Sequence, residues 1–414
     1  MPTIAEKILA RAAKRDQVKT NEIVMAKVDV AMSHENADVV IRAFKEIGLK
    51  KVWDPERIVI IFDHRIPAES EKSAATHKRI REFVKTQNIK YFYDMREGIC
   101  HQVLAEFGHC RPGEILVGTD SHTTTHGAFG TFAAGIGGTE MAGVWSTGEI
   151  WFKVPESMKI TVHGKFKEFI SAKDLILFII GQLGSDGADY MAVEFHGSTI
   201  SEMTIASRMV LSNLSMEMGA KVAFILPDEK TISFVRERTK KEFTAVLPDR
   251  DAQYARSLDV DAASLRSQIA CPHAVDNVKK VREVSGLKIN QALIGSCTNG
   301  RLEDLKVAAS IIEGKNVHPD VRLLIIPASR RIYLDATKAG YIETLVKAGG
   351  LVLNPGCGPC LGAHQGLLAA GERCIATTNR NFQGRMGSSD AEVYLASPAT
   401  VAFSAIKGEI TEPC

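Results

Sequence analysis

Short apolar segments rich in β-branched residues alternate along the first part of the chain with longer segments of helical period. Residues 57–63, 89–94 and 114–120 predict buried strands, since a short apolar run between polar residues is typical of a strand covered on both faces. Residues 69–87 and 139–152 predict helices. This order of strand and helix is typical of an α/β fold with a mainly parallel sheet.

The same alternation returns after residue 280, where residues 290–297, 321–329 and 350–356 predict strands. A mixed segment of strands and helices lies between the two regions. Within it, the polar residues 235–268 have the composition of a surface insertion or a boundary. We also expect residues 391–410 to be helical. The chain therefore predicts three α/β domains, with ranges 1–155, 156–280 and 281–414.

The composition of the chain indicates which kinds of binding partner are disfavoured. The 414 residues include 51 basic and 49 acidic side chains, a formal net charge of +2, which favours neither nucleic acid nor an anionic membrane surface. No apolar run reaches the roughly 18 residues of a membrane span, and the first residues lack a signal-peptide pattern. We therefore expect a cytoplasmic protein. Its eight cysteines are too sparse for a disulfide scaffold.

Three cysteines lie directly after predicted strands of the last domain: Cys297, Cys357 and Cys360. The carboxyl ends of parallel strands meet at one edge of a sheet, so these thiols can converge. Thiolates select zinc, copper(I) or iron–sulfur clusters, and a closed zinc site needs four ligands. Three cysteines on a [4Fe–4S] cluster leave one iron open. The spacing alone also allows thioredoxin-like redox chemistry or structural free thiols.

Acid–base residues gather in three short motifs and one helix. The candidates are Asp63 and His64, His101, Asp120 with Ser121 and His122, and Asn213 with Glu217 on one helix face. A carboxylate beside an imidazole fixes its tautomer and raises its basicity, as a general acid requires. The alternative is that each histidine is a hydrogen-bonded loop residue or cap.

Asn379, Arg380 and Arg385 lie in a polar, glycine-containing segment near the end of the chain. Guanidinium groups bind carboxylates in bidentate fashion, so both arginines are candidates for an acidic substrate, with solvated surface arginines as the alternative. The glycine-rich residues 129–141 lack the dinucleotide-binding spacing. We interpret them as close backbone packing before a helix.

Four motifs together resemble the aconitase family, especially its separate large subunits of the isopropylmalate dehydratase and homoaconitase type. They are GTDSHT (118–123), IGSCTNGRLEDL (294–305), NPGCGPCLG (354–362) and NRNFQGRMG (379–387). The resemblance covers essentially the whole chain. It implies a three-domain aconitase-like core with mainly parallel sheets that lacks the fourth, swivel domain of single-chain aconitases.

The resemblance also implies a cofactor and residue roles. Cys297, Cys357 and Cys360 would hold a [4Fe–4S] cluster with one iron not ligated by cysteine. Three histidine–carboxylate pairs would surround the substrate, with His64 protonating the leaving hydroxyl. Ser121, Asn213, Asn379, Arg380 and Arg385 would bind the substrate or lie beside it.

The activity implied is dehydration and rehydration of a 2-hydroxy acid, together with a small subunit that carries the swivel domain, in a heterodimer or heterotetramer. We favour 3-isopropylmalate, because leucine biosynthesis is the commonest setting of this two-subunit arrangement. Homocitrate, homoaconitate and small alkylmalates such as dimethylmalate share the same core and are alternatives.

One alternative belongs to a different class, and one position departs from the family pattern. Relatives of the aconitase scaffold bind RNA when the cluster is lost, and three thiols can hold zinc. The near-neutral charge and the lack of basic stretches with interleaved aromatics argue against RNA.

His34 is followed by Glu35, where relatives often carry aspartate, and the sequence gives no basis for a role of Glu35 in the site.

Overall fold

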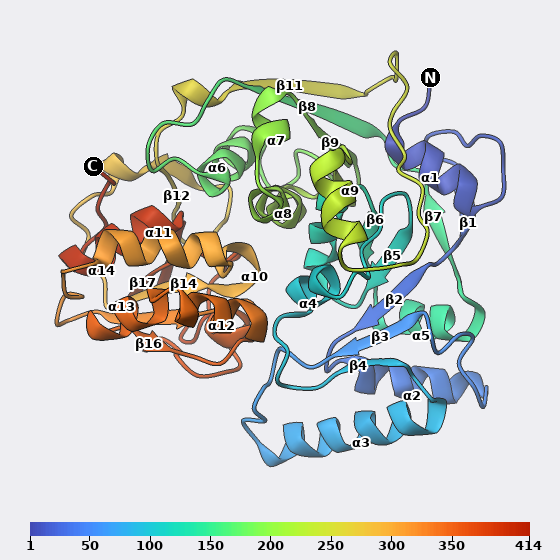
Figure 1. The fold of residues 1–414 in the computed structure, drawn as a ribbon, viewed down its shortest axis with the longest axis horizontal. Coiled ribbons are helices and arrows are strands. Elements are labelled where there is room, and N and C mark those ends of the chain that lie inside the picture. The colour runs from blue at the N-terminus through green and yellow to red at the C-terminus, as the bar shows by residue number, and fades with distance from the viewer.

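The computed structural model describes residues 1–414 and shows a mixed α/β protein with three mainly parallel sheets and a two-stranded antiparallel sheet formed by residues 23–27 and 149–153. Figure 1 shows α2 and α3 at one end of the molecule, α6 to α9 at the other, and α11 to α14 beside them. We propose that these groupings are domains with borders near residues 155 and 280. The predicted fold class is confirmed. No helix combines the length and the hydropathy needed to cross a membrane.

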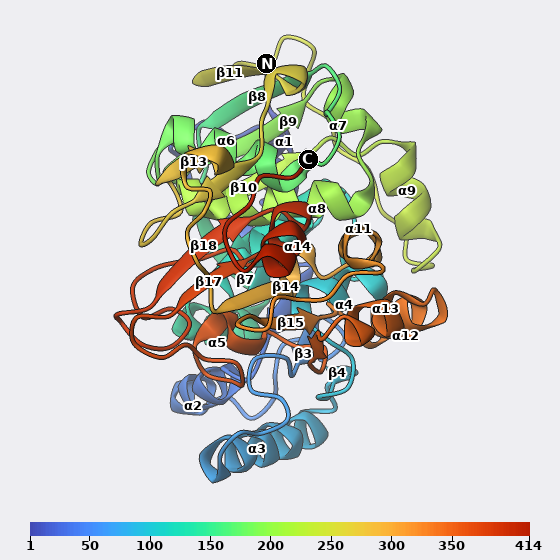
Figure 2. The ribbon, with the colours of Figure 1, turned by 90° about the vertical axis from the view of Figure 1, so that its left-hand side faces the viewer.

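The first sheet has five parallel strands in the order β4-β3-β2-β5-β6. Helices α2, α3 and α5 lie on one side of β2 to β4 and α4 on the other (Figures 1 and 2). The elements up to the second sheet are α1 (Ile4–Ala12), β1 (Ile23–Lys27), β2 (Val30–Ser33), α2 (Ala37–Ile47), β3 (Ile58–Ile61), α3 (Glu71–Gln87), β4 (Tyr91–Tyr93), α4 (Cys100–Glu106), β5 (Ile115–Gly118), η1 (Ser121–Phe129), β6 (Phe132–Gly135), α5 (Gly138–Thr147) and β7 (Glu149–Lys153).

The second sheet has four parallel strands in the order β10-β9-β8-β11. Its elements are β8 (Ser157–His163), α6 (Ala172–Leu183), β9 (Ala192–His196), α7 (Ser198–Glu202), α8 (Ile205–Leu214), η2 (Ser215–Met218), β10 (Val222–Ile225), α9 (Glu229–Arg236), β11 (Arg256–Asp261) and η3 (Ala262–Ser264). Strand β11 pairs with β8, so part of the polar segment 235–268 completes this sheet instead of forming an insertion.

The third sheet has seven strands in the order β13-β12-β18-β17-β14-β15-β16, and only the pairs of β12 are antiparallel. Its elements are β12 (Gln268–Ala270), β13 (Val278–Lys280), η4 (Val281–Glu283), β14 (Gln291–Gly295), α10 (Ser296–Asn299), α11 (Leu302–Ile312), β15 (Arg322–Ile326), α12 (Arg330–Lys338), α13 (Tyr341–Lys347), β16 (Leu351–Val352), η5 (Gly358–Leu361), β17 (Arg373–Ala376), β18 (Glu392–Ala396) and α14 (Pro398–Lys407).

Two predicted helices are each part strand in the structure. Within 139–152, α5 ends at Thr147 because Gly148 adopts the left-handed conformation, and β7 follows with alternating exposure. Within 391–410, residues 392–396 form the buried strand β18, and Pro398 begins α14 at a position where its missing N–H costs no hydrogen bond. Apolar content alone does not separate a buried strand from a helix.

One large apolar core joins the three sheets. Val59 of β3, Phe195 of β9 and Leu293 of β14 belong to the same cluster of buried side chains. Burial of apolar surface between sheets stabilises their relative placement by roughly 25 cal/mol for each Å² removed from water. The shared core therefore fixes the positions of the strand-end loops of the three groupings relative to one another.

Candidate active site

Three neighbouring strands of the first sheet deliver acid–base residues at their carboxyl ends. Strand β3 is followed by Asp63 and His64, β5 by Asp120, and β2 by Glu35. The strands are parallel, so these ends meet at one edge, as expected for ligand sites of open α/β sheets. Close packing supports this edge: a Cβ on Gly135 would lie 2.8 Å from the Asp120 carbonyl oxygen. The predicted role of the glycine-rich segment is confirmed at this position.

His64 lies between two aspartates. Its Nδ1 is 2.6 Å from Asp63 Oδ1, and its Nε2 is 3.5 Å from Asp120 Oδ2. Burial alone would lower the pKa of His64, but the charge of Asp63 and hydrogen bonds with both aspartates raise it well above its usual value. The two aspartates therefore favour the protonated form of His64, the form that a general acid requires.

Asp120 also accepts from its other neighbours. His101 Nε2 lies 2.9 Å from Asp120 Oδ1, and the His122 backbone N–H donates to the same oxygen at 2.8 Å. Burial would raise the pKa of Asp120, but the hydrogen bonds from His101, His122 and His64 hold it well below its usual value. Asp120 is thus a fixed anion that orients the histidines around it.

Glu35 has a structural role that the sequence did not indicate. Its side chain accepts backbone N–H bonds from Asp63 at 3.1 Å, His64 at 2.9 Å and Arg65 at 2.9 Å. The carboxylate therefore holds the loop that carries the Asp63–His64 pair. The His34 ring stacks on His64 with centroids 4.0 Å apart. The Glu35 side chain is thus bound to the backbone of residues 63–65.

The second histidine–carboxylate pair joins all three sheets. His122 Nε2 lies 2.7 Å from Glu217 Oε1, and Arg380 Nε donates to that same oxygen at 2.8 Å. His122 follows β5, Glu217 lies on η2, and Arg380 follows β17. Burial would lower the pKa of His122, but its hydrogen bonds with Asp120 and Glu217 raise it. Ser121 Oγ is 3.5 Å from His122 Nδ1 and thus lies at the edge of this group.

The three predicted metal-ligating thiols lie near one another, Cys297 in α10, Cys360 in η5 and Cys357 at the N-cap of η5. Asn379 Nδ2 donates to Cys297 Sγ at 3.3 Å, and the Cys360 thiol donates to Asn379 Oδ1 at 3.5 Å. Asn213 Nδ2 also lies 3.4 Å from Cys297 Sγ. The backbone N–H of Cys357 donates to the Asp63 carbonyl at 2.8 Å, which ties the thiol loop to the acid–base loop.

The donor set fits an iron–sulfur cluster better than a single zinc ion. Cys357 and Cys360 form a coupled pair in which the Cys357 thiol donates to Cys360 and lowers the pKa of Cys360. Burial and the charge of Cys360 raise the pKa of Cys297 to about 11. Three thiols are one ligand fewer than a closed tetrahedral zinc site requires. Amide donors facing sulfur, as Asn213 and Asn379 do, are typical of iron–sulfur sites.

Arg385 lies over the thiol loop. Burial would lower its pKa, but the charges of Cys360 and Cys357 raise it, and its buried Nε has no hydrogen-bond partner in the structure. An unpartnered buried donor costs about 1–3 kcal/mol, so it is a candidate for a substrate carboxylate. The structure thus brings the predicted acid–base, arginine and thiol residues into one region.

Two buried cations near the thiols were missed. Arg301 donates to the carbonyls of Cys297 at 2.8 Å and Thr298 at 2.6 Å. Lys173, with no exposed surface, donates to the carbonyls of Thr377 at 2.9 Å and Thr378 at 2.5 Å. The sequence signal for such a residue is a single basic side chain at the start of an apolar helix, because basic side chains are rarely buried.

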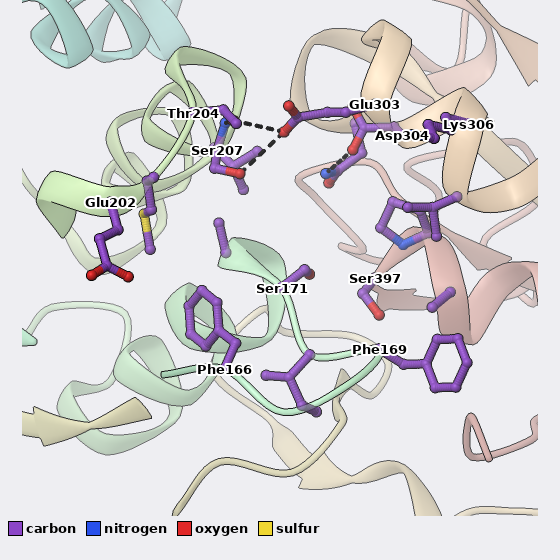
Figure 3. Close-up of a pocket in the computed structure, with 18 of the residues that line it drawn as sticks. Phe166, Phe169, Ser171, Glu202, Thr204, Ser207, Glu303, Asp304, Lys306 and Ser397 are labelled. Carbon is purple, nitrogen blue, oxygen red and sulfur yellow. Dashed lines mark hydrogen bonds between the residues drawn. The ribbon is translucent and has the colours of Figure 1, made fainter. Parts of the chain in front are cut away.

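A separate cavity of about 770 Å³ lies among helices and loops of the second and third groupings, and its lining includes Ala172 and Asn299, close to Lys173 and Arg301 in the chain. Figure 3 shows its polar rim, where Thr204 and Ser207 donate to Glu303 at 2.9 and 3.1 Å. None of the predicted site residues lines it. The cavity therefore lies between the second and third groupings and is not part of the acid–base site.

Comparison with known proteins agrees with this geometry. The family model described as "Aconitase family (aconitate hydratase)" matches residues 6–286 and 276–408. The chain is 53% identical over 412 residues to "3-isopropylmalate dehydratase large subunit 1" of Methanopyrus kandleri, covering 99% of this chain and 98% of that protein. It is 54% identical over 391 residues to "Probable methanogen homoaconitase large subunit" of Methanosarcina mazei, covering 94% and 99%.

A solved structure shows the same fold at low sequence identity. It is the holo-form of aconitase X from Thermococcus kodakaraensis, with a TM-score of 0.52 and 13% identity over 89% of this chain and 88% of that one. The family model and the relatives cover nearly the whole chain, including every residue of the site described above. The chain belongs to the aconitase family and is a hydro-lyase of that family.

Proposed function

We propose that this chain is the large catalytic subunit of a hydro-lyase that isomerises 3-isopropylmalate by dehydration and rehydration. The observation that carries the proposal is the convergence of an imidazolium–aspartate pair, two candidate carboxylate-binding arginines and three thiols from separate sheets. Elimination of water from a 2-hydroxy acid needs an acid for the hydroxide, a cation beside the carboxylate and a base for the C–H proton. This chain carries groups for the first two.

In this proposal, Cys297, Cys357 and Cys360 hold a [4Fe–4S] cluster with one iron free of cysteine. Such an iron supplies Lewis-acid polarisation of hydroxyl and carboxylate oxygens. The set of three thiols and the amide donors on Cys297 support this assignment.

His64 is the proposed proton donor to the leaving hydroxyl. Asp63 holds Nδ1, so Nε2 is the nitrogen that faces the shared region and donates. Asp120, His101, His122 and Glu217 form the fixed hydrogen-bond network that keeps this ring and the substrate in register. Arg385, with its unpartnered Nε, and Arg380 are the proposed carboxylate-binding groups.

We assign the proton on carbon no acceptor among these residues, because each carboxylate of the site is already the hydrogen-bonded partner of a histidine. We propose that a small subunit carrying a swivel domain supplies the base, in a heterodimer or heterotetramer. The relatives are named as large subunits, which supports a two-chain enzyme.

Homoaconitase is the second candidate function. The relative from Methanosarcina mazei with that name is as similar to this chain as the dehydratase relative is. The two substrates share the 2-hydroxy dicarboxylate part and differ in the group that the partner subunit would contact. A tricarboxylate would require an additional cation there.

The test is a dehydration assay of the anaerobically reconstituted chain with its small subunit, using 3-isopropylmalate, homocitrate, citrate and dimethylmalate. Preference for 3-isopropylmalate is the expected result, and preference for homocitrate would establish the second candidate. Iron and acid-labile sulfide are measured on the same samples. Zinc without sulfide would contradict both candidates, and full activity of the single chain would contradict the partner proposal.

A further inference from the structure

Lys173 is a fully buried lysine that the proposed mechanism does not use. It lies in the first turn of α6, in the second grouping, and its Nζ reaches the third sheet. There it donates to two consecutive backbone carbonyls, Thr377 at 2.9 Å and Thr378 at 2.5 Å. These are the first two residues beyond the end of β17. The Thr377 N–H still donates to the carbonyl of Leu293 on β14, and the Thr298 hydroxyl also donates to the Thr377 carbonyl, so the ammonium adds its own hold at Thr378.

No carboxylate pairs with this ammonium. Asp174 accepts from the backbone of Gln268 and from Ser171, and Asp304 accepts from Asn299 and from the backbone of Arg301. A buried cation without a paired anion is costly. The remaining negative groups around it are the thiols Cys297 and Cys360, which become thiolates when they bind metal.

The two carbonyls precede two residues of the site. Asn379 contacts both Cys297 and Cys360, and Arg380 donates to Glu217. A shift of the backbone at Thr378 moves both side chains together. Displacement of catalytic groups by about 1 Å can reduce rates by about 100-fold.

We propose that Lys173 is a positioning residue, which sets Asn379 against the cluster cysteines and Arg380 against Glu217 by holding the carbonyls of Thr377 and Thr378. The inference rests on the proposed function, since it requires a cluster on these cysteines. Lys173 lies on helix α6 of the second grouping, whereas the carbonyls belong to the third. The geometry of the site therefore also depends on how the second grouping is placed.

The test compares Lys173→Met with the parent chain, each reconstituted anaerobically with the small subunit. Methionine has similar length but donates no hydrogen bond. We expect kcat/KM to fall about 10–100-fold, the range for residues that orient metal ligands, with a rise in KM as Arg380 shifts. We also expect a changed electron paramagnetic resonance spectrum and a displaced reduction potential, because Asn379 no longer donates to Cys297 in the same geometry.

Lys230→Met is the matched control. Lys230 also donates to two consecutive carbonyls, those of Ser201 at 2.7 Å and Glu202 at 2.9 Å, but it lies on α9 away from the thiols. The Lys230→Met variant should have the electron paramagnetic resonance spectrum, the reduction potential and the KM of the parent protein. A folded Lys173→Met protein with the parent spectrum and KM would overturn the inference.

A second variant covers failure of Lys173→Met to fold. Lys173→Gln keeps a polar side chain but is shorter and uncharged, so it cannot donate to both carbonyls as the ammonium does. We expect it to fold with an altered spectrum and raised KM, and parental values would overturn the inference. Parent protein without iron and sulfide would instead contradict the proposed function, so the two failures are distinguishable.

Discussion

At the residue scale, the position of one proton on His64 depends on Asp63. The aspartate is fully buried and its second oxygen accepts the backbone N–H of Cys100 at 2.7 Å, so it cannot turn away from the ring. An imidazolium beside a fixed anion is stabilised relative to the neutral ring. The acid form therefore persists to higher pH than in a free histidine, and activity that needs it declines as pH rises through the raised pKa.

Asp63→Asn should move this alkaline limb to lower pH. Removal of the anion lowers the pKa of His64, so the ring loses its proton earlier as pH rises. The measurement is kcat against pH from neutral to alkaline conditions. Asp259→Asn, an exposed position on β11, is the control and should leave the profile unchanged. An alkaline limb that does not move in Asp63→Asn would show that another group sets it.

At the element scale, two glycines close together in the chain have opposite roles. A Cβ on Gly135, at the end of β6, would lie 2.8 Å from the Asp120 carbonyl oxygen and 3.0 Å from Ser121 Cα. Gly143 lies inside α5, where a Cβ would meet nothing within 4 Å. The first glycine permits an approach of backbone to backbone, whereas the second only weakens a helix.

Gly135→Ala should reduce kcat, by up to about 100-fold, because the Asp120 loop must move. Gly143→Ala should leave kcat unchanged and raise the free energy of unfolding by about 0.5–1 kcal/mol, the difference in helix propensity. The measurements are the dehydration rate and the midpoint of thermal unfolding. Equal dehydration rates in the two variants would contradict the prediction, because they would show that the end of β6 accommodates the added methyl group without moving the Asp120 loop.

The strands and helices themselves were predicted with uneven success, for a physical reason. The helix expected at 69–87 is α3, because its polar face and N-terminal Ser70 cap are local properties. The strand predicted at 350–356 is only Leu351–Val352 in β16, and β18 lies within residues for which the sequence predicts a helix. A buried strand is stabilised by neighbours from elsewhere in the chain, so its own residues carry little of the signal.

At the scale of the whole molecule, a cluster held by the three cysteines would also stabilise the fold. Cys357 is tied to Asp63 of the first grouping, and Asn213 of the second contacts Cys297 of the third. A group that binds only the folded state raises its stability in proportion to the affinity. Loss of the cluster should therefore loosen all three groupings together.

Cys357→Ser should lose iron and sulfide and lower the midpoint of thermal unfolding under anaerobic conditions. Cys414→Ser is the control, since Cys414 is exposed and far from the site in sequence. Iron and sulfide analysis and calorimetry give the two readouts. Full iron content with an unchanged midpoint in Cys357→Ser would contradict the ligand assignment.

The sequence by itself determined the α/β class, the family and the chemical groups of the site, because parallel strand ends and short motifs are local features. Only the tertiary structure decided which groups touch. The bonds of Glu35 to the 63–65 loop, of Lys173 to the carbonyls after β17, and of Arg380 to Glu217 join residues 28 to 205 positions apart. Such contacts depend on how three sheets pack, and packing is a property of the whole core that no short segment carries.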